Sequence, residues 1–218
     1  MKKREKSTTW LYTGVVCLVL SIVFIFAVTA VDVQEIGPNG TSVGFAGING
    51  AIAKAIGSNM VWYKITQLLG YLAIVIFAFY AICGVVQLIK RKSLFKVDQD
   101  LLVMGYMFIV LFLLYIAFDK VAINYRPMLL PGETSLEPSF PSSHTMLALC
   151  VFGTSWLFFK RRLGQGKAYS IIRVMMLVLM VVTVVGRLLS GAHWFTDIIG
   201  GLLISLTLVS FYAAFSQK

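Results

Sequence analysis

Charged residues are scarce in this sequence, and acidic residues are the scarcest. Asp, Glu, Lys and Arg together make up 13% of the 218 residues, and only 9 of these residues are acidic. A soluble domain typically has about 25% charged residues. With 59% hydrophobic residues, the composition excludes an ordinary soluble domain and predicts a protein embedded in a membrane.

Cysteine is also rare, and its placement predicts no disulfide. The three cysteines, Cys17, Cys83 and Cys150, are an odd number, and each lies in an apolar stretch. We find no internal repeat and no low-complexity tract, so we expect residues 1–218 to form a single membrane domain. The net charge of +10 comes from basic clusters between apolar runs, which argues against a nucleic-acid-binding face.

Long apolar runs dominate the sequence instead. A helix that spans a bilayer needs about 20 apolar residues, within a range of about 17–25. We identify six runs, of which the fourth is short: Trp10–Val31, Ile65–Ile89, Leu101–Phe118, Thr145–Phe159, Ala168–Leu189 and Trp194–Phe215. They predict an all-α polytopic membrane protein with six transmembrane helices. The first run is longer than the apolar region of a signal peptide, so we expect it to be retained as a helix.

The basic residues predict the orientation of these helices in the membrane. In an alternating six-helix arrangement, 13 of the 19 Lys and Arg residues fall on one side, including Lys218. The positive-inside rule makes that side cytoplasmic. We therefore expect a multi-pass cell-membrane protein with both termini in the cytoplasm and with its first, third and fifth connections facing outward.

The outward connections hold most of the unexplained polar residues. The first connection contains GFAGINGAIAKAIG, whose apolar residues recur at helical spacing and predict a short helix in the membrane interface. The other two bring charged and polar residues to one membrane level: Lys120, Arg126, Ser142, Ser143, His144, Arg187, His193 and Asp197.

Several of these residues have an ordinary structural role open to them. Lys120 can extend to the lipid headgroups, a lone histidine can be structural, and Ser142 or Ser143 can cap a helix. Asp197 is harder to explain, because a carboxylate inside an apolar helix is costly without a partner. His193 lies four residues earlier, so we expect a hydrogen bond between the two on one helix face. That bond would fix the imidazole tautomer and leave the other nitrogen free to react.

Taken together, the eight residues predict a phosphate site. Three cations and a helix N-terminus form an anion site, to which the serines add donors. A histidine beside a carboxylate is an activated nucleophile or base, and a second histidine can protonate a leaving oxygen. We therefore predict phosphoryl transfer to water without a metal ion or other cofactor. The residues alone do not decide which histidine attacks, although the His193–Asp197 spacing favours His193.

At these positions the sequence resembles the type 2 phosphatidic acid phosphatases, membrane relatives of the vanadium haloperoxidases. That family has three ordered motifs: Lys followed by Arg-Pro, then Pro-Ser-Gly-His, then Ser-Arg, five residues, His, three residues and Asp. Here the motifs, within residues 119–201, are Lys120-VAINY-Arg126-Pro127, Pro141-Ser142-Ser143-His144 and Gly186-Arg187-LLSGA-His193-WFT-Asp197.

The resemblance implies a role for each residue. The counterpart of His193 attacks phosphorus and becomes a phosphohistidine, and the counterpart of Asp197 orients it. The counterpart of His144 protonates the leaving group and then activates water. The remaining counterparts hold the phosphoryl oxygens: Lys120, Arg126, Ser142, Ser143 and Arg187.

Three positions depart from the family pattern. Five residues rather than six separate Lys120 from Arg126, which turns Lys120 toward a different helix face. Ser143 replaces a glycine that lets the backbone approach phosphate, and we expect this change to be tolerated. Gly186 replaces a serine, and we expect the loss of a single hydrogen bond.

The function implied by the resemblance is that of a metal-independent lipid phosphatase with an outward-facing site at the helix ends. Candidate substrates are undecaprenyl diphosphate of a bacterial envelope, phosphatidic acid and phosphatidylglycerophosphate, each with its tail in the lipid bilayer. The alternative is a lipid-phosphate binding or transport protein that has lost turnover. The intact His144, His193 and Asp197 argue against this alternative, because binding alone needs only the cations.

Overall fold

The chain folds into a bundle of helices joined by short turns and one long loop. The computed structural model describes residues 2–130 and 132–216; Lys218, used in the orientation argument, lies outside these ranges. Within them the α-helices are α1 (Lys2–Ala30), α2 (Ala46–Ile56), α3 (Met60–Arg91), α4 (Gln99–Lys120), α5 (Ser143–Leu163), α6 (Lys167–Leu189) and α7 (Phe195–Phe215). The predicted all-α fold is confirmed. The six apolar runs correspond to α1 and α3–α7, and the predicted interface helix corresponds to α2.

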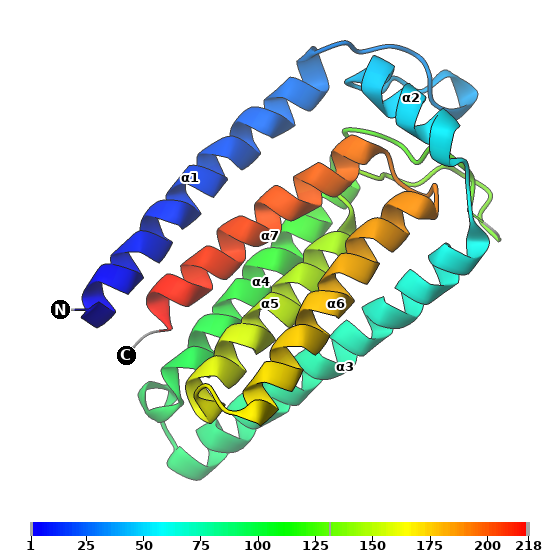
Figure 1. The fold of residues 1–218 in the computed structure, drawn as a ribbon. Helices are drawn as coiled ribbons and strands as arrows, with labels where there is room; N and C mark the ends of the chain where they lie inside the picture. Colours follow the sequence, from blue (N-terminus) through cyan, green and yellow to red (C-terminus); the bar gives the residue numbers. More distant parts are fainter. Residues whose placement is uncertain (1, 131, 217–218) are drawn as a thin grey trace.

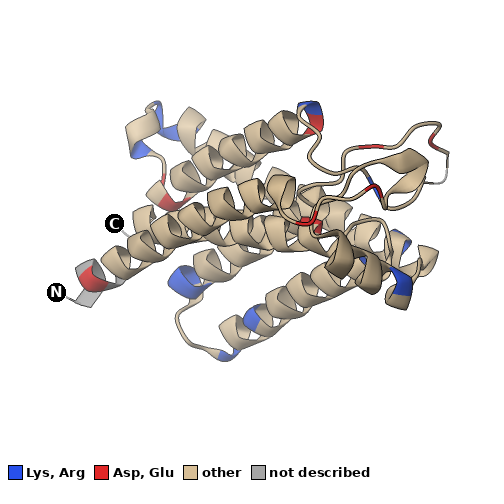
Figure 2. Ribbon diagram, turned by 90° about the horizontal axis from the view of Figure 1, so that it is seen from above, with Lys and Arg blue, Asp and Glu red and all other residues tan. Residues whose placement is uncertain are grey.

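The six long helices alternate in direction, so their connections collect at two ends of the bundle (Figure 1). Both termini, the α3–α4 connection and the α5–α6 turn lie at one end, here called the termini end. The short helix α2, the α4–α5 loop and the α6–α7 turn lie at the other, the loop end. All three predicted motifs therefore meet at the loop end. Figure 2 shows that charged residues concentrate toward the two ends and leave the middle of the bundle nearly free of charge.

Among the described residues, five helices are long and apolar enough to cross a membrane, whereas α5 is of similar length but is not apolar enough. Its middle carries Thr154 and Ser155, and its last turn carries three basic residues. Both hydroxyls donate to backbone carbonyls one turn earlier in α5, so they are buried without an unsatisfied donor. Because α5 packs against α3, α4, α6 and α7, it is covered by protein rather than by lipid. The predicted sixth span is thus a helix at the centre of the bundle.

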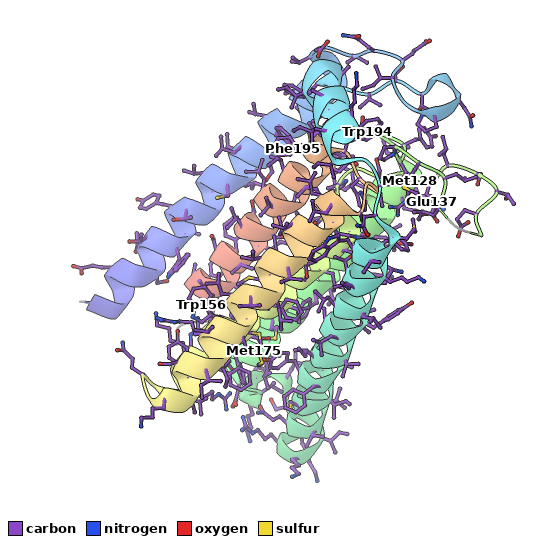
Figure 3. The ribbon with its side chains drawn as sticks, turned by 45° about the vertical axis from the view of Figure 1, so that its right-hand side comes forward. Met128, Glu137, Trp156, Met175, Trp194 and Phe195 are labelled. Carbon is purple, nitrogen blue, oxygen red and sulfur yellow. The ribbon has the colours of Figure 1, made fainter. Side chains whose placement is uncertain are left out.

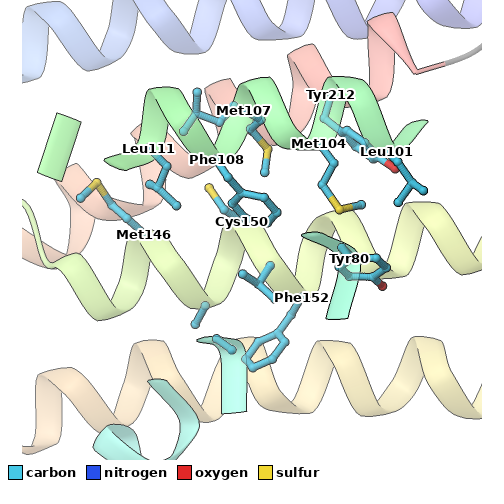
Figure 4. Packing of buried hydrophobic residues seen from close by; sticks show 14 of the residues in the cluster. Tyr80, Leu101, Met104, Met107, Phe108, Leu111, Met146, Cys150, Phe152 and Tyr212 are labelled. Carbon is cyan, nitrogen blue, oxygen red and sulfur yellow. The ribbon is translucent and has the colours of Figure 1, made fainter. Parts of the chain in front are cut away.

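The core of the bundle lies where α4, α5 and α7 meet. Met104 and Phe108 of α4, Cys150 and Phe152 of α5, and Tyr212 of α7 are all buried in one cluster (Figure 4). In a membrane, an apolar side chain gains little free energy by leaving lipid for the protein interior, so hydrophobicity alone does not determine which helices pack together. Close packing of the side chains determines it instead. The cluster leaves α5 firmly held with its N-terminus at the loop end.

A polar clamp joins α3, α4 and α5 at the termini end. Asp98, just before α4, accepts hydrogen bonds at 2.8 Å from Arg91 of α3 and at 2.8 Å from Arg162 of α5. The Arg91 guanidinium, followed by the Gln87 amide, lowers the pKa of Asp98 to about 2. The clamp therefore stays charged at every physiological pH.

Candidate active site

His193 lies buried in the turn between α6 and α7, and both of its ring nitrogens have partners. Nδ1 is 3.1 Å from the carbonyl oxygen of Ser139, and because a carbonyl only accepts, Nδ1 carries the proton. Nε2 therefore has a lone pair, which faces Nη1 of Arg126 at 3.2 Å. Burial, and then the charges of Arg126 and Arg187, hold the pKa of His193 well below its usual value. His193 is neutral at pH 7, as a nitrogen nucleophile must be.

The predicted hydrogen bond between His193 and Asp197 is absent, and this prediction was wrong. Their closest atoms, Nδ1 and Oδ2, are 3.6 Å apart. Asp197 instead accepts from the backbone N–H of Trp194 at 2.9 Å and from Nδ2 of Asn124 at 3.1 Å. The i, i+4 argument failed because His193 precedes α7, which begins two residues later. The buried Asp197 carboxylate still lies close enough to His193 to stabilise a positive charge on the ring.

Asn124 is a site residue that the sequence argument missed. It is fully buried in the α4–α5 loop, and its backbone carbonyl oxygen accepts a hydrogen bond from the backbone N–H of Ser139 at 2.8 Å. It therefore links Asp197 to the segment whose carbonyl fixes the His193 tautomer. A polar residue two positions before Arg126, within the first motif, was the signal that could have identified it.

His144, one residue inside α5, is hydrogen-bonded to Arg187 of α6. Its Nδ1 accepts from Nη2 of Arg187 at 2.6 Å. Arg187 is 1% exposed; its Nη1 lies 3.3 Å from Oγ1 of Thr66, and its guanidinium lies 5.3 Å from the centre of the Tyr63 ring. The sequence argument missed both α3 residues, which lie at the start of an apolar helix. No pattern in the sequence singles out Thr66, because its neighbours Lys64 and Gln67 are also polar.

Arg126 connects the α4–α5 loop to the α6–α7 turn. Its Nε donates to Oε2 of Glu137 at 3.0 Å, and its Nη1 donates to the carbonyl oxygen of Ala192 at 3.2 Å. The guanidinium is thereby fixed beside His193. In Figure 3, the labelled Glu137 lies at the loop end near Met128 and Trp194, whereas Trp156 and Met175 lie toward the termini end.

The two serines of the second motif have different positions. Ser142 is fully buried and caps α5, since its Oγ accepts from the backbone N–H and from the hydroxyl of Thr145 at 3.4 Å and 3.0 Å. The predicted helix-cap role of Ser142 is therefore confirmed. Ser143 begins the helix and lines the cavities described below.

Lys120 is not brought into this cluster. It is the last residue of α4, its side chain is 78% exposed, and its Nζ lies 3.7 Å from a carboxylate oxygen of the neighbouring Asp119. Asp119, Arg126 and His193 line a common cavity that Lys120 does not line. The helix-face argument for the shortened spacing does not apply, because α4 ends at Lys120 and Arg126 lies in the following loop.

Gly186 has a larger role than the expected loss of one hydrogen bond. A Cβ atom on Gly186 would lie 2.7 Å from Cγ2 of Thr66 and 3.0 Å from the ring of Trp62. A serine does not fit at this distance, so glycine allows α6 to pack directly on α3. This close packing places Thr66 and Tyr63 against Arg187.

Two adjacent cavities reach the cluster. The smaller, of about 110 Å³, is lined by Asp119, Arg126, Glu137, Ser143 and His193 among others. The larger is a groove of about 1060 Å³ between α3 and α4, lined mainly by apolar side chains and, near the loop end, by His144. Three residues line both spaces: Tyr115, Ser143 and Met146.

The donors gathered at the loop end suit an anion. Two buried arginines, a helix N-terminus and two histidines converge there. Across residues 2–130 and 132–216, no three His, Cys, Asp or Glu side chains are grouped so that they could hold a metal ion.

Comparisons with known proteins agree with the motifs. Residues 123–218 match the model of the PAP2 superfamily. Phosphatidylglycerophosphatase B of Bacillus subtilis (strain 168) is 29% identical over 101 residues, which are 46% of this chain and about half, 48%, of that protein. A crystal structure described as the first transmembrane PAP2 type phosphatidylglycerolphosphate phosphatase from Bacillus subtilis has the same fold, with a TM-score of 0.63 and 23% identity over 93% of this chain and 94% of that one. The similarity to the PAP2 superfamily therefore covers residues 123–218, which contain Arg126 and the second and third motifs.

Proposed function

We propose that this protein is an integral-membrane lipid phosphatase that works through a phosphohistidine at His193. The proposal rests on an apolar groove that adjoins the cavity lined by Arg126 and His193. A lipid tail lying between α3 and α4 would bring its phosphate past Ser143 to Arg126 and His193, because Ser143 lines both spaces. A soluble phosphate ester has no apolar tail that could occupy a groove of about 1060 Å³ lined mainly by apolar side chains.

The chemistry follows from the two histidines. The Nε2 lone pair of His193 forms a bond to phosphorus, the bond from phosphorus to the lipid oxygen breaks, and that oxygen keeps the electron pair. His144, as an imidazolium, gives this oxygen a proton and becomes neutral. His144 then takes a proton from water, which attacks the phosphohistidine and releases phosphate. Arg126, Arg187 and Ser143 would hold the phosphoryl oxygens.

The hydrogen bond between Arg187 and His144 must open for this sequence to proceed. While Nδ1 of His144 accepts from Nη2 of Arg187 at 2.6 Å, that nitrogen cannot carry a proton. A phosphoryl oxygen that binds Arg187 would draw the guanidinium away and leave Nδ1 free. The substrate would thus convert His144 into the acid that its own cleavage requires.

Phosphatidylglycerophosphate is the first substrate to test, because both similar Bacillus subtilis proteins are named for that activity. Purified protein should release phosphate from it faster than from phosphatidic acid or undecaprenyl diphosphate in mixed micelles. The rate should persist in EDTA, since the proposed steps use only side chains. Loss in EDTA that magnesium restores would contradict the mechanism. Binding of all three lipids without phosphate release would favour the alternative of an inactive lipid-phosphate binding or transport protein.

We also propose that the loop end faces outward and that both termini are cytoplasmic, because the basic clusters lie at the termini end. Ser135→Cys in the α4–α5 loop should react with an impermeant thiol reagent in intact cells, and Gln165→Cys in the α5–α6 turn should react only after lysis. Both positions are exposed. The nearby Gly132 and Gly164 are unsuitable because their φ angles are +90° and +64°. The unmodified protein, with its three native cysteines, is the control. The opposite labelling pattern would place the site in the cytoplasm.

A further inference from the structure

The edge of the His144 ring that faces α3 is unusually close to the backbone of that helix. A Cβ atom built on Gly70 would lie 2.8 Å from Cδ2 and 3.1 Å from Nε2 of His144. Real Cβ atoms essentially never approach another heavy atom as closely as 2.8 Å. Any side chain at position 70 would therefore force either the imidazole or α3 to move.

The opposite edge of the same ring is held by Arg187. Because Nη2 donates to Nδ1 at 2.6 Å, the ring proton in this state is on Nε2, the nitrogen that faces Gly70. Both Gly70 and His144 line the groove between α3 and α4. The N–H group of His144 is thus presented to the groove from which a lipid would come.

We infer that Gly70 is a positioning residue: because it has no side chain, the His144 ring can pack directly on α3 and present its Nε2–H to the groove, where it can reach the leaving-group oxygen of the substrate. That oxygen has to lie about 2.7–3.2 Å from Nε2 to accept its hydrogen bond. The Cβ atom of any other residue at position 70 would lie 2.8 Å from Cδ2 and 3.1 Å from Nε2, so the ring would have to leave this position. This inference rests on the proposed function, and Gly70 lies outside the segment matched by the family model, residues 123–218.

The leaving-group step makes this ring position necessary. When the phosphorus–oxygen bond breaks, the electron pair stays on the lipid oxygen, and the Nε2 proton of the His144 imidazolium moves to that oxygen. The transfer needs the oxygen within hydrogen-bond reach of Nε2. A methyl group at position 70 would displace the ring and, with it, the nitrogen that carries this proton.

The test is Gly70→Ala, assayed on phosphatidic acid and on diacylglycerol pyrophosphate with the same acyl chains. The first substrate expels an alkoxide and depends on the acid; the second expels a phosphate ester and depends on it less. We expect kcat/KM for phosphatidic acid to fall by about 10²-fold or more, the range of general acid catalysis. The loss for the pyrophosphate should be at least tenfold smaller. Gly84→Ala on the same helix has no atom within 4 Å of its Cβ position, so it should leave the ratio of the two rates unchanged.

A double-mutant cycle with His144→Ala separates this role from general damage to the fold. Once the ring is absent, the added methyl has nothing to displace, so Gly70→Ala should cost no further activity in that background. Additive losses, equal losses on the two substrates, or full activity of Gly70→Ala would each overturn the inference. The clash should lower the thermal unfolding midpoint of Gly70→Ala, and the same substitution should not lower the midpoint in the His144→Ala background, where the ring is absent. If the unmodified protein hydrolyses neither lipid, the proposed function itself fails, which is a different result.

Discussion

His193→Ala should abolish turnover of every lipid phosphate, because it removes the nitrogen that we propose forms the phosphoenzyme. His193 is the histidine whose nucleophilic lone pair lies beside Arg126 and whose proton is fixed on Nδ1 by the Ser139 carbonyl. The residual rate should be indistinguishable from that of a blank. The measurement is phosphate release from phosphatidylglycerophosphate, together with label retained on protein that is denatured at alkaline pH after brief exposure to radiolabelled substrate, because phosphohistidine is stable in base and hydrolysed by acid.

The matched control for this prediction is His193→Gln. A glutamine amide can still donate to the Ser139 carbonyl and leaves fewer unpaired buried groups, so this variant should unfold at nearly the temperature of the unmodified protein. It has no nucleophilic nitrogen and should be equally inactive. Acid-labile, base-stable label on either variant, combined with its absence from His144→Ala, would show that the roles of the two histidines are reversed.

His144→Ala should have the second-largest effect, and the effect should depend on the leaving group. Hydrolysis of phosphatidic acid should slow by about 10²–10⁴-fold, because an alkoxide must be protonated as it departs. Hydrolysis of a lipid diphosphate should retain a larger fraction of its rate, because the departing phosphate ester is a better leaving group. Initial rates on phosphatidic acid and diacylglycerol pyrophosphate with identical tails measure the difference.

The same variant should also accumulate phosphoenzyme. Water still has to be activated in the second step, so removal of His144 leaves His193 labelled for longer than in the unmodified protein. An identical loss on the two substrates, with no gain in label, would mean that His144 supports the site structurally rather than by proton transfer.

Most of the fold could be predicted from the sequence because long, apolar runs of residues identify membrane-spanning helices. Even α5, whose apolar run Thr145–Phe159 is short, was identified, although its burial by other helices could not be inferred from composition. Lipid and the protein interior are similarly apolar, so the composition of a transmembrane helix does not tell whether lipid or other helices cover it. The central position of α5 had to come from the structure.

The sequence predicted which residues gather at the site more reliably than it predicted the contacts between them. The motifs brought Arg126, Ser143, His144, Arg187 and His193 to one end, where the structure places them together. The contact between His193 and Asp197 was mistaken because helical spacing was applied across a helix start. The supporting residues in α3 could not be predicted, since nothing local links a threonine or a glycine in one helix to an arginine more than a hundred positions later.

The groove between α3 and α4 is open along its side as well as at the loop end. Tyr71, Ile109 and Phe112 line it and are 57–61% exposed, so in a bilayer they face lipid. A substrate of the proposed phosphatase that enters here would move in the plane of the membrane and would never pass through water. Its encounter rate would then be set by its mole fraction among the surrounding lipids, so the proposed activity would respond to the composition of the membrane and not to the amount of lipid in the cell.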